Sequence, residues 1–241
     1  MLAFNHHSYL DFLMVGWPVV RQLGRPLRFL AKREIWASRK VGWAVRWAEA
    51  VPVDRGSPAA RERAFDAAVE ALQAGDLVGV APEQTISASF ELLPLRTGAA
   101  RMAQLAGVPI VPVAGWGTQR VLAKGGHRQL RTRLPVTVRF GPPIRVGPED
   151  DPTAATEQLR ERMAALLDQV QRGYPDGIPA GAPWVPQRLG GGAPAHAQVL
   201  REHRERERGW QPSAAPHPEH RDVQDGRSTE FEGGREDGDE R

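Results

Sequence analysis

The chain of 241 residues is long enough for one ordinary domain and a tail, and it contains no cysteine, which excludes a disulfide framework, a thiol nucleophile and a thiolate metal site. Its formal charge of +3 is unevenly spread: residues 1–200 carry 24 basic and 17 acidic side chains, and residues 201–241 carry 8 and 12. The basic body suits an anionic partner, namely a nucleic acid, a phosphorylated metabolite or an anionic lipid surface. No apolar run reaches the roughly 18–20 residues of a membrane span, and no signal-peptide pattern follows Met1.

The first 54 residues predict a strand, a helix and a second strand. Residues 2–4 are typical of the end of a strand, and Ser8 is a candidate N-cap for a helix that runs to about Leu23, before Gly24. Residues 50–54 (AVPVD) indicate a short strand. Between the helix and this strand lies an aromatic-rich stretch that contains Trp36, Val41, Trp43, Val45 and Trp47.

Residues 57–114 alternate between helical and strand patterns. Ser57 and Pro58 are typical of a cap followed by a first helical residue. The next apolar positions share one helical face and are Phe65, Ala68, Val69 and Leu72. The runs 77–81 (LVGVA) and 108–114 (VPIVPVA) are continuously apolar, as in strands buried on both faces, and a small-residue helix over 97–106 separates them. Because helical crossovers join parallel strands, this order predicts a parallel sheet with helices on its faces.

Two further elements complete the predicted domain. Residues 135–140 (PVTVRF) alternate between apolar and polar, which predicts another strand. Residues 153–172 form an amphipathic helix whose apolar face contains Leu159, Met163, Leu166, Leu167 and Val170.

The composition changes after Tyr174. Gly, Pro, Ala and charged residues dominate residues 175–241, so we expect a mostly disordered tail, apart from a docked Trp184 and a marginal helix near 195–208. The sequence therefore predicts an α/β domain over residues 1–174, with a mixed, largely parallel central sheet flanked by helices, and a disordered C-terminal tail.

Polar side chains follow three of the predicted strands. Asn5 and His6 come after the first, Asp54 and Arg55 after the second, and residues 82–85 (PEQT) after the third. Because the carboxyl ends of parallel strands meet at the same edge of a sheet, we expect a functional site at this edge.

His6 and Asp11 are the two residue types that a proton-abstracting dyad needs, and four residues separate them. The alternative is structural, because Ser8 and Asp11 also form a capping-box pattern, although that pattern leaves His6 unexplained. His7 is expected to be a neighbour of the dyad and not a participant.

Four motifs resemble those of the glycerophospholipid acyltransferase family, in the family's order. NHHSYLD (5–11) is similar to the first motif, a His and an Asp separated by four residues, and VPVDR (51–55) to the second. APEQTIS (81–87), followed by ELLPLRTGAARMA, is similar to the third, and VPIVPVA (108–114) to the proline-centred fourth. The resemblance covers about residues 1–120, and the closest likeness is to the 1-acylglycerol-3-phosphate acyltransferases.

The resemblance implies transfer of an acyl chain from acyl-CoA or acyl-carrier-protein to the free hydroxyl of lysophosphatidate, giving phosphatidate. His6 would be the general base, and Asp11 would hold the imidazole in the right tautomer. The acceptor hydroxyl would take the place of a nucleophilic serine, so the transfer would be direct. We expect no metal and no cofactor besides the acyl donor as co-substrate.

The resemblance also assigns acceptor and phosphate binding to the second and third motifs. Arg55 would bind the phosphate, since a guanidinium suits its oxygens. Glu83, Gln84 and Thr85 would form the acceptor-binding segment, with Glu83 bonded to acceptor hydroxyls or to Arg55. Gln84 stands where the family usually has Gly, so it either prevents a positive φ or holds one under strain. Ile86 stands where a basic residue is frequent.

The resemblance implies a lysophospholipid acceptor, a peripheral membrane association and a location at the inner face of the cell membrane. Family members usually have tens of residues before the first motif, so we expect that the start of this chain is assigned too late. Two alternatives remain open within the family: another lysophospholipid or glycolipid acceptor, and an inactive lipid-binding relative. Nucleic-acid binding is a fourth possibility that no motif favours.

Overall fold

The computed structural model describes residues 1–32, 51–53, 57–124 and 133–209. The described strands form one six-stranded sheet in the order β3-β2-β4-β1-β5-β6, in which only β6 runs antiparallel to its neighbour. The strands are β1 (Leu2–Phe4), β2 (Leu27–Lys32), β3 (Val51–Val53), β4 (Leu77–Val80), β5 (Val111–Trp116) and β6 (Thr137–Phe140). The predicted α/β fold with a mixed, largely parallel central sheet is confirmed.

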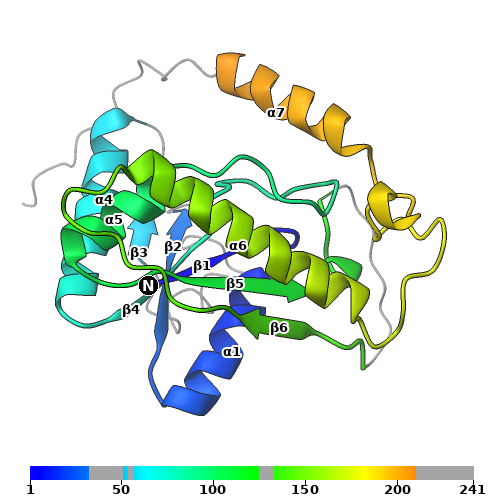
Figure 1. Cartoon of the computed structure of the whole chain (residues 1–241), viewed down its shortest axis with the longest axis horizontal. Coiled ribbons are helices and arrows are strands. Elements are labelled where there is room, and N and C mark those ends of the chain that lie inside the picture. The colour runs from blue at the N-terminus through cyan, green and yellow to red at the C-terminus, as the bar shows by residue number, and fades with distance from the viewer. Residues whose placement is uncertain (33–50, 54–56, 125–132, 210–241) are drawn as a thin grey trace, which may run out of the picture.

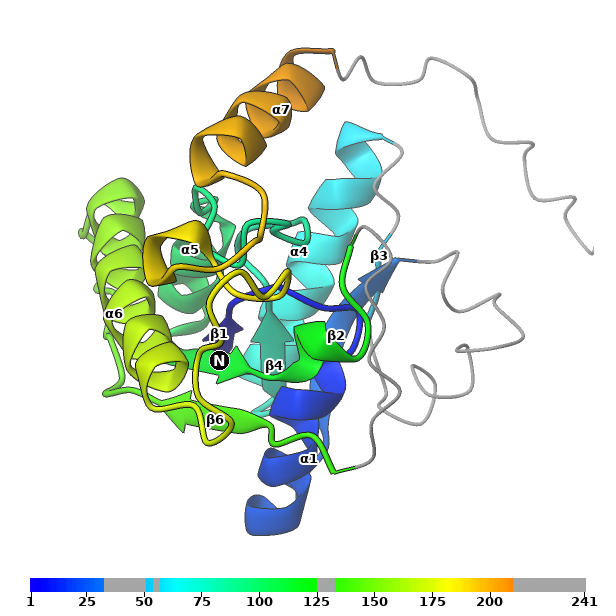
Figure 2. The same cartoon turned by 90° about the vertical axis from the view of Figure 1, so that its right-hand side faces the viewer.

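Helices cover both faces of this sheet (Figure 1, Figure 2). They are α1 (Asp11–Leu23) on one face and α4 (Pro58–Gln73), α5 (Gly98–Ala106) and α6 (Pro152–Arg172) on the other. The last described helix, α7 (His196–Gly209), lies apart from the sheet (Figure 1). Apolar side chains of α4, α5 and α6 form one buried cluster with Ala3 of β1, while α1 packs on the opposite face against Leu2 and Phe4. Because successive side chains of β1 point to opposite faces of the sheet, this strand contributes to the buried core on each face, as expected of a central strand.

The predicted helix and strand boundaries hold where local signals are strong. The Ser57 side chain accepts a hydrogen bond from Ala60 N and caps α4, with Pro58 as its first residue. Gly24 and Gly107 adopt left-handed conformations that end α1 and α5. The predicted apolar face of the helix over 153–172 is buried in α6. The tryptophan-rich stretch lies outside the described residues.

The start of α1 and the whole of β2 differ from the predictions. Ser8 is not the N-cap of α1, which begins at Asp11, because the Ser8 hydroxyl lies within hydrogen-bond distance of the Thr118 and Leu122 carbonyl oxygens instead. Strand β2 has no counterpart among the predicted elements. Leu27 and Phe29 are buried in the cluster with α1, and Arg28 between them forms an ion pair with Asp76.

The tail predicted to be mostly disordered is instead packed against the domain over residues 175–195, beyond the docking expected of Trp184 alone. Trp184 docks as expected, and it is buried with Val185 and Ala193 against α6 and β5. Arg120 lies 4.4 Å from the centre of the Trp184 ring and bonds to Asp176 at 2.5 Å. The marginal helix is present as α7, and residues 210–241 lie outside the described part of the chain. Among the described helices, none combines the length and apolar character needed to cross a bilayer.

Candidate active site

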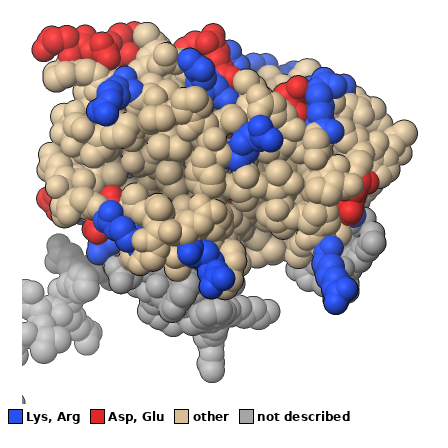
Figure 3. All heavy atoms as spheres, turned by 60° about the horizontal axis from the view of Figure 1, so that its bottom comes forward, with Lys and Arg blue, Asp and Glu red and all other residues tan. Residues whose placement is uncertain are grey.

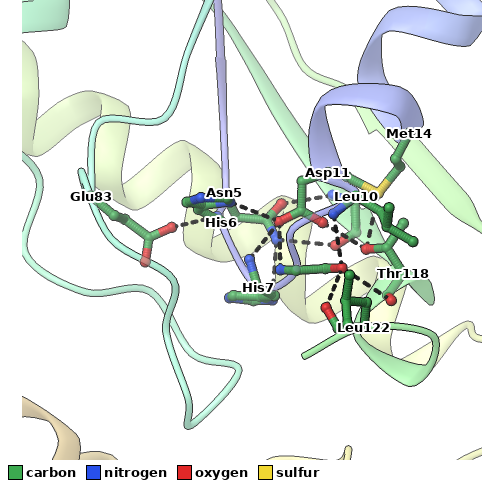
Figure 4. A network of polar contacts seen from close by, with 11 residues as sticks. Asn5, His6, His7, Leu10, Asp11, Met14, Glu83, Thr118 and Leu122 are labelled. Atoms are coloured by element: carbon green, nitrogen blue, oxygen red, sulfur yellow. Dashed lines mark hydrogen bonds and ion pairs between the residues drawn. The ribbon is translucent and has the colours of Figure 1, made fainter. Parts of the chain in front are cut away.

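The candidate site lies where β1, β4 and β5 end. β1 pairs in parallel with both β4 and β5, so the segments that follow these three strands meet at one edge of the sheet. His6 and Asp11 follow β1, Glu83 follows β4, and Thr118 follows β5 (Figure 4). The structure therefore brings together His6, Asp11 and Glu83 as the sequence predicted.

The centre of the site is a hydrogen bond of 3.1 Å between His6 Nδ1 and Asp11 Oδ2. Asp11 is 1% exposed, whereas the His6 side chain is 27% exposed, so the imidazole reaches the surface and the carboxylate does not. Donation from Nδ1 to the carboxylate leaves Nε2 of a neutral ring free to accept a proton. The pair has the arrangement of a general base and its orienting acid.

Asp11 also organises the backbone that carries the histidine. Its Oδ2 accepts hydrogen bonds from His7 N at 2.6 Å and Ser8 N at 2.7 Å, and its Oδ1 accepts one from Thr118 Oγ1 at 2.6 Å. Because α1 begins at Asp11 and Ser8 is not its N-cap, the two residues do not form the capping box that their spacing suggested, although Asp11 does accept the Ser8 N–H. Four donors therefore hold this buried carboxylate in one orientation.

Glu83 holds the backbone of His6 in place. Its Oε1 accepts a hydrogen bond from His6 N at 2.8 Å, and its Oε2 accepts one from Leu93 N at 2.9 Å. Ser87 N donates to the His6 carbonyl oxygen at 2.8 Å. Residues of the third motif therefore form hydrogen bonds with both the N–H and the carbonyl group of His6. Glu83 is 1% exposed and both of its carboxylate oxygens accept backbone hydrogen bonds, so its predicted contact with the acceptor stays a prediction.

Gln84 adopts the conformation for which a glycine is usual. Its φ is +57°, and its N–H donates to the Ala81 carbonyl oxygen at 3.0 Å. Of the two outcomes expected for this substitution, the turn is thus retained under strain, at a cost of about 1–3 kcal/mol. Gln84 is exposed and Thr85 half-buried, and Ile86 is buried, so only the first two of these side chains border the surface beside His6.

Asn5 and His7 flank His6 in the sequence and are buried on the protein side of the site. Asn5 Oδ1 accepts a hydrogen bond from Gly115 N at 2.7 Å and its Nδ2 donates to the Gly115 carbonyl oxygen, which fixes the end of β1 to β5. His7 is buried between the rings of Phe90 and Trp116, and burial lowers its pKa to about 4. His7 is therefore a neutral neighbour of the dyad, in agreement with the prediction.

Arg55 was predicted from the sequence as a site residue, whereas Thr118 was not. Arg55 lies outside the described residues, so its role as a phosphate ligand stays a prediction. Thr118 was not anticipated, because nothing in its local sequence distinguishes it from any threonine that follows a strand. The described residues contain no group of three or more His, Asp or Glu side chains that could hold a metal ion.

The buried position of Glu83 makes the stability of the protein depend on pH. Burial raises the pKa of Glu83 from 4.5 to about 8, although the hydrogen bonds from Leu93 and His6 oppose the shift. The folded state therefore binds this proton more tightly than the unfolded chain does, and the resulting stabilisation, complete below about pH 4.5, is lost as pH rises through about 8. In Glu83→Gln the side chain cannot ionise, so we expect a smaller loss of unfolding free energy between pH 5 and pH 8 than in wild type.

Urea unfolding at several pH values checks this prediction. Glu70→Gln, at an exposed position of α4, is the matched control and should keep the wild-type slope. If the unfolding free energy changed with pH in the same way in wild type and Glu83→Gln, the prediction would be contradicted.

Comparison with known proteins gives consistent matches. A family model described as Acyltransferase matches residues 1–116, a range that contains His6, Asp11 and Glu83. The 1-acyl-sn-glycerol-3-phosphate acyltransferase of Bacillus subtilis (strain 168) is 28% identical over 176 residues, which are 70% of this chain and 83% of that protein. The chloroplastic 1-acyl-sn-glycerol-3-phosphate acyltransferase BAT2 of Brassica napus is 31% identical over 123 residues, or 51% of this chain and 34% of that protein. The chain thus spans about a third of the chloroplastic relative.

A solved structure supports the fold. The crystal structure of the 1-acyl-sn-glycerophosphate (LPA) acyltransferase PlsC from Thermotoga maritima superposes with a TM-score of 0.56 and 22% sequence identity. The match covers 72% of this chain and 66% of that one. At this identity the likeness establishes a shared fold and nothing about the site.

Proposed function

We propose that the chain is an acyltransferase of the family whose model it matches, and that it transfers an acyl chain from a thioester donor to the free hydroxyl of lysophosphatidate, giving phosphatidate. The observation that carries the proposal is the pair of His6 and Asp11, in which a buried carboxylate orients a partly exposed imidazole. Such a base suits an alcohol acceptor, because an alcohol is too weak an acid to attack a thioester unaided.

In the proposed reaction, His6 Nε2 takes the proton of the acceptor hydroxyl while the hydroxyl oxygen attacks the thioester carbonyl carbon. The new carbon–oxygen bond forms, the carbon–sulfur bond breaks, and the proton passes from His6 to the leaving thiolate. Asp11 stabilises the imidazolium that exists between these two proton transfers. The acceptor hydroxyl is itself the nucleophile, so the proposal requires no acyl-enzyme.

Recognition of the acceptor is assigned to the second and third motifs. Arg55 would bind the phosphate, as the resemblance implies, and Gln84 and Thr85 border the surface next to the base. Acyl-CoA and acyl-carrier-protein both present a thioester, so either would serve as the donor, and the proposal needs no further cofactor.

The test of this function is acyl transfer to lysophosphatidate in mixed micelles. Radiolabelled acyl-CoA and acyl-carrier-protein are supplied in turn, and phosphatidate is the product measured. Formation of phosphatidate by wild type supports the proposal and identifies the donor. Turnover only with another lysophospholipid or with a glycolipid would change the acceptor. Donor binding without turnover on any acceptor would overturn the proposal in favour of an inactive lipid-binding relative.

We further propose that α1 rests on the membrane surface. Leu13 and Trp17 are four residues apart on α1, so they share a helical face, and both are exposed, as is Tyr9 just before the helix. The opposite side of α1 packs against the sheet, and Arg21 and Arg25 are exposed at its C-terminal end. Figure 3 brings forward the side of the molecule on which α1 lies and shows broad uncharged areas between Lys and Arg side chains.

An apolar helical face with aromatic side chains and nearby arginines is typical of helices that lie in an anionic membrane interface. Tyr9 follows His6 by three residues, so a membrane on this face would lie close to the base and to a lipid acceptor. The association would be peripheral, and its assignment to the inner face of the cell membrane stays a prediction.

Replacing two of these side chains should weaken membrane binding. In the double variant Leu13→Ser, Trp17→Ser, we expect vesicles that contain phosphatidylglycerol to be bound at least about tenfold more weakly, since each large apolar side chain contributes about 1.5–3 kcal/mol when buried. Vesicle co-sedimentation measures the change. Leu105→Ser is the matched control, because Leu105 is similarly exposed but lies on α5, on the other face of the sheet. Equal binding by the double variant and the control would contradict this orientation.

A further inference from the structure

The two oxygens of the Asp11 carboxylate have very different surroundings. Oδ2 accepts three N–H groups, from the His6 ring and from the backbones of His7 and Ser8. Oδ1 has one hydrogen bond in the described part of the structure, from Thr118 Oγ1 at 2.6 Å. Asp11 is 1% exposed and Thr118 6%, so solvent cannot readily replace that donor. The direction in which the carboxylate faces the imidazole therefore depends on the Thr118 hydroxyl.

The segment of residues 5–11, to which Thr118 donates a hydrogen bond at Asp11, in turn holds Thr118 in place. Thr118 begins the short 3-10 helix η1 (Thr118–Arg120), directly after β5. The Ser8 hydroxyl lies 3.1 Å from the Thr118 carbonyl oxygen and 2.7 Å from that of Leu122. Tyr9 N also donates to the Leu122 carbonyl oxygen, at 3.3 Å, so the first motif and η1 are joined through several bonds (Figure 4).

Gly117 allows η1 to approach in this way. Its φ is +116°, and a Cβ at this position would overlap the Pro135 carbonyl oxygen, so only glycine fits. The chain can then turn sharply at the end of β5 and place Thr118 beside Asp11. Thr118 lies two residues beyond the part of the chain that the Acyltransferase family model matches.

We propose that Thr118 is a positioning residue for the proposed acyl transfer, acting through Asp11. By donating to Oδ1, its hydroxyl fixes the plane of the carboxylate so that Oδ2 faces His6 Nδ1. This inference rests on the proposed function, because its main effect is expected on the rate of proton abstraction.

The substitution that tests it is Thr118→Val, which keeps the shape of the side chain and removes the hydroxyl. We expect kcat to fall about 10- to 100-fold, the factor for one hydrogen bond to a charged group, with KM within about twofold of wild type. Thr118→Ser restores a hydroxyl and should recover most of the activity. Thr156→Val is the matched control: Thr156 is 7% exposed, and its hydroxyl bonds to the Pro152 carbonyl oxygen within α6.

A double variant separates positioning from a general effect on folding. If Thr118 acts through the charge of Asp11, adding Thr118→Val to Asp11→Asn should lower kcat little further. An equal loss in both backgrounds would overturn the inference, as would near-normal kcat in Thr118→Val or a Thr118→Ser variant as impaired as Thr118→Val.

A second measurement does not depend on turnover, so it also distinguishes failure of this inference from failure of the proposed function. The ¹⁵N NMR signals of the His6 ring, assigned by their loss in His6→Ala, report which ring nitrogen carries the proton. We expect the Nδ1-protonated form to lose population in Thr118→Val and to keep it in Thr118→Ser and Thr156→Val. An unchanged tautomer in Thr118→Val would overturn the inference whether or not acyl transfer is detected. Absence of phosphatidate in wild type would overturn only the proposed function.

Discussion

His6→Ala should lower kcat for phosphatidate formation by about 10²- to 10⁴-fold, the range for loss of a general base. The acceptor alcohol would then have to lose its proton to water while it attacks the thioester. The fold should survive, because His6 uses only its own backbone groups in its bonds to the Glu83 carboxylate and to Ser87 N. Asp11 would keep three of its four hydrogen-bond donors.

Two measurements accompany this variant. Thermal unfolding should show a melting temperature within a few degrees of wild type, which separates lost chemistry from lost structure. His203→Ala is the matched control, because this histidine lies on α7 and pairs with Glu207 at 3.1 Å. Its kcat should match that of wild type. Near-normal activity in His6→Ala would exclude His6 as the base and with it the proposed mechanism.

Asp11→Asn should lower kcat by about 10³-fold without unfolding the protein. The charge of Asp11 stabilises the imidazolium by about 4 kcal/mol if the effective dielectric constant is about 20, which corresponds to this factor. An asparagine can place its amide oxygen at the position of Oδ2, where it still accepts the three N–H groups. Its NH₂ group would then face Thr118 Oγ1, and a hydroxyl can rotate to accept.

Asp11→Ala gives the contrast that makes this prediction specific. It removes the charge too, but it also leaves the N–H groups of His7 and Ser8 without their buried acceptor, which destabilises the loop. We expect both variants to lose activity and only Asp11→Ala to lose several degrees in melting temperature. If Asp11→Asn kept most of its kcat, Asp11 would be a structural cap and not a partner of the base.

The parts of the fold that sequence predicted are those governed by short-range rules. The run LVGVA is β4, and the helix after Ser57 begins where a capping side chain and a proline require it. Strand β2 escaped prediction because its neighbours in the sheet, β3 and β4, are distant in sequence. Apart from the docked Trp184, the packing of residues 175–195 escaped too, since burial of Val185 and Ala193 depends on a surface built by α6 and β5.

The sequence by itself determined that a histidine, an aspartate and a glutamate would meet at one edge of a parallel sheet, because each follows a strand or begins the helix after it. Only the tertiary structure decided what each carboxylate does. Glu83 binds the backbone of His6, 77 residues away, and Asp11 receives the hydroxyl of Thr118, 107 residues away. The physical reason is that the parallel pairing of β1 with β4 and β5 brings these residues together in space. The sequence around a side chain carries no local pattern that identifies a partner on the segment after another strand.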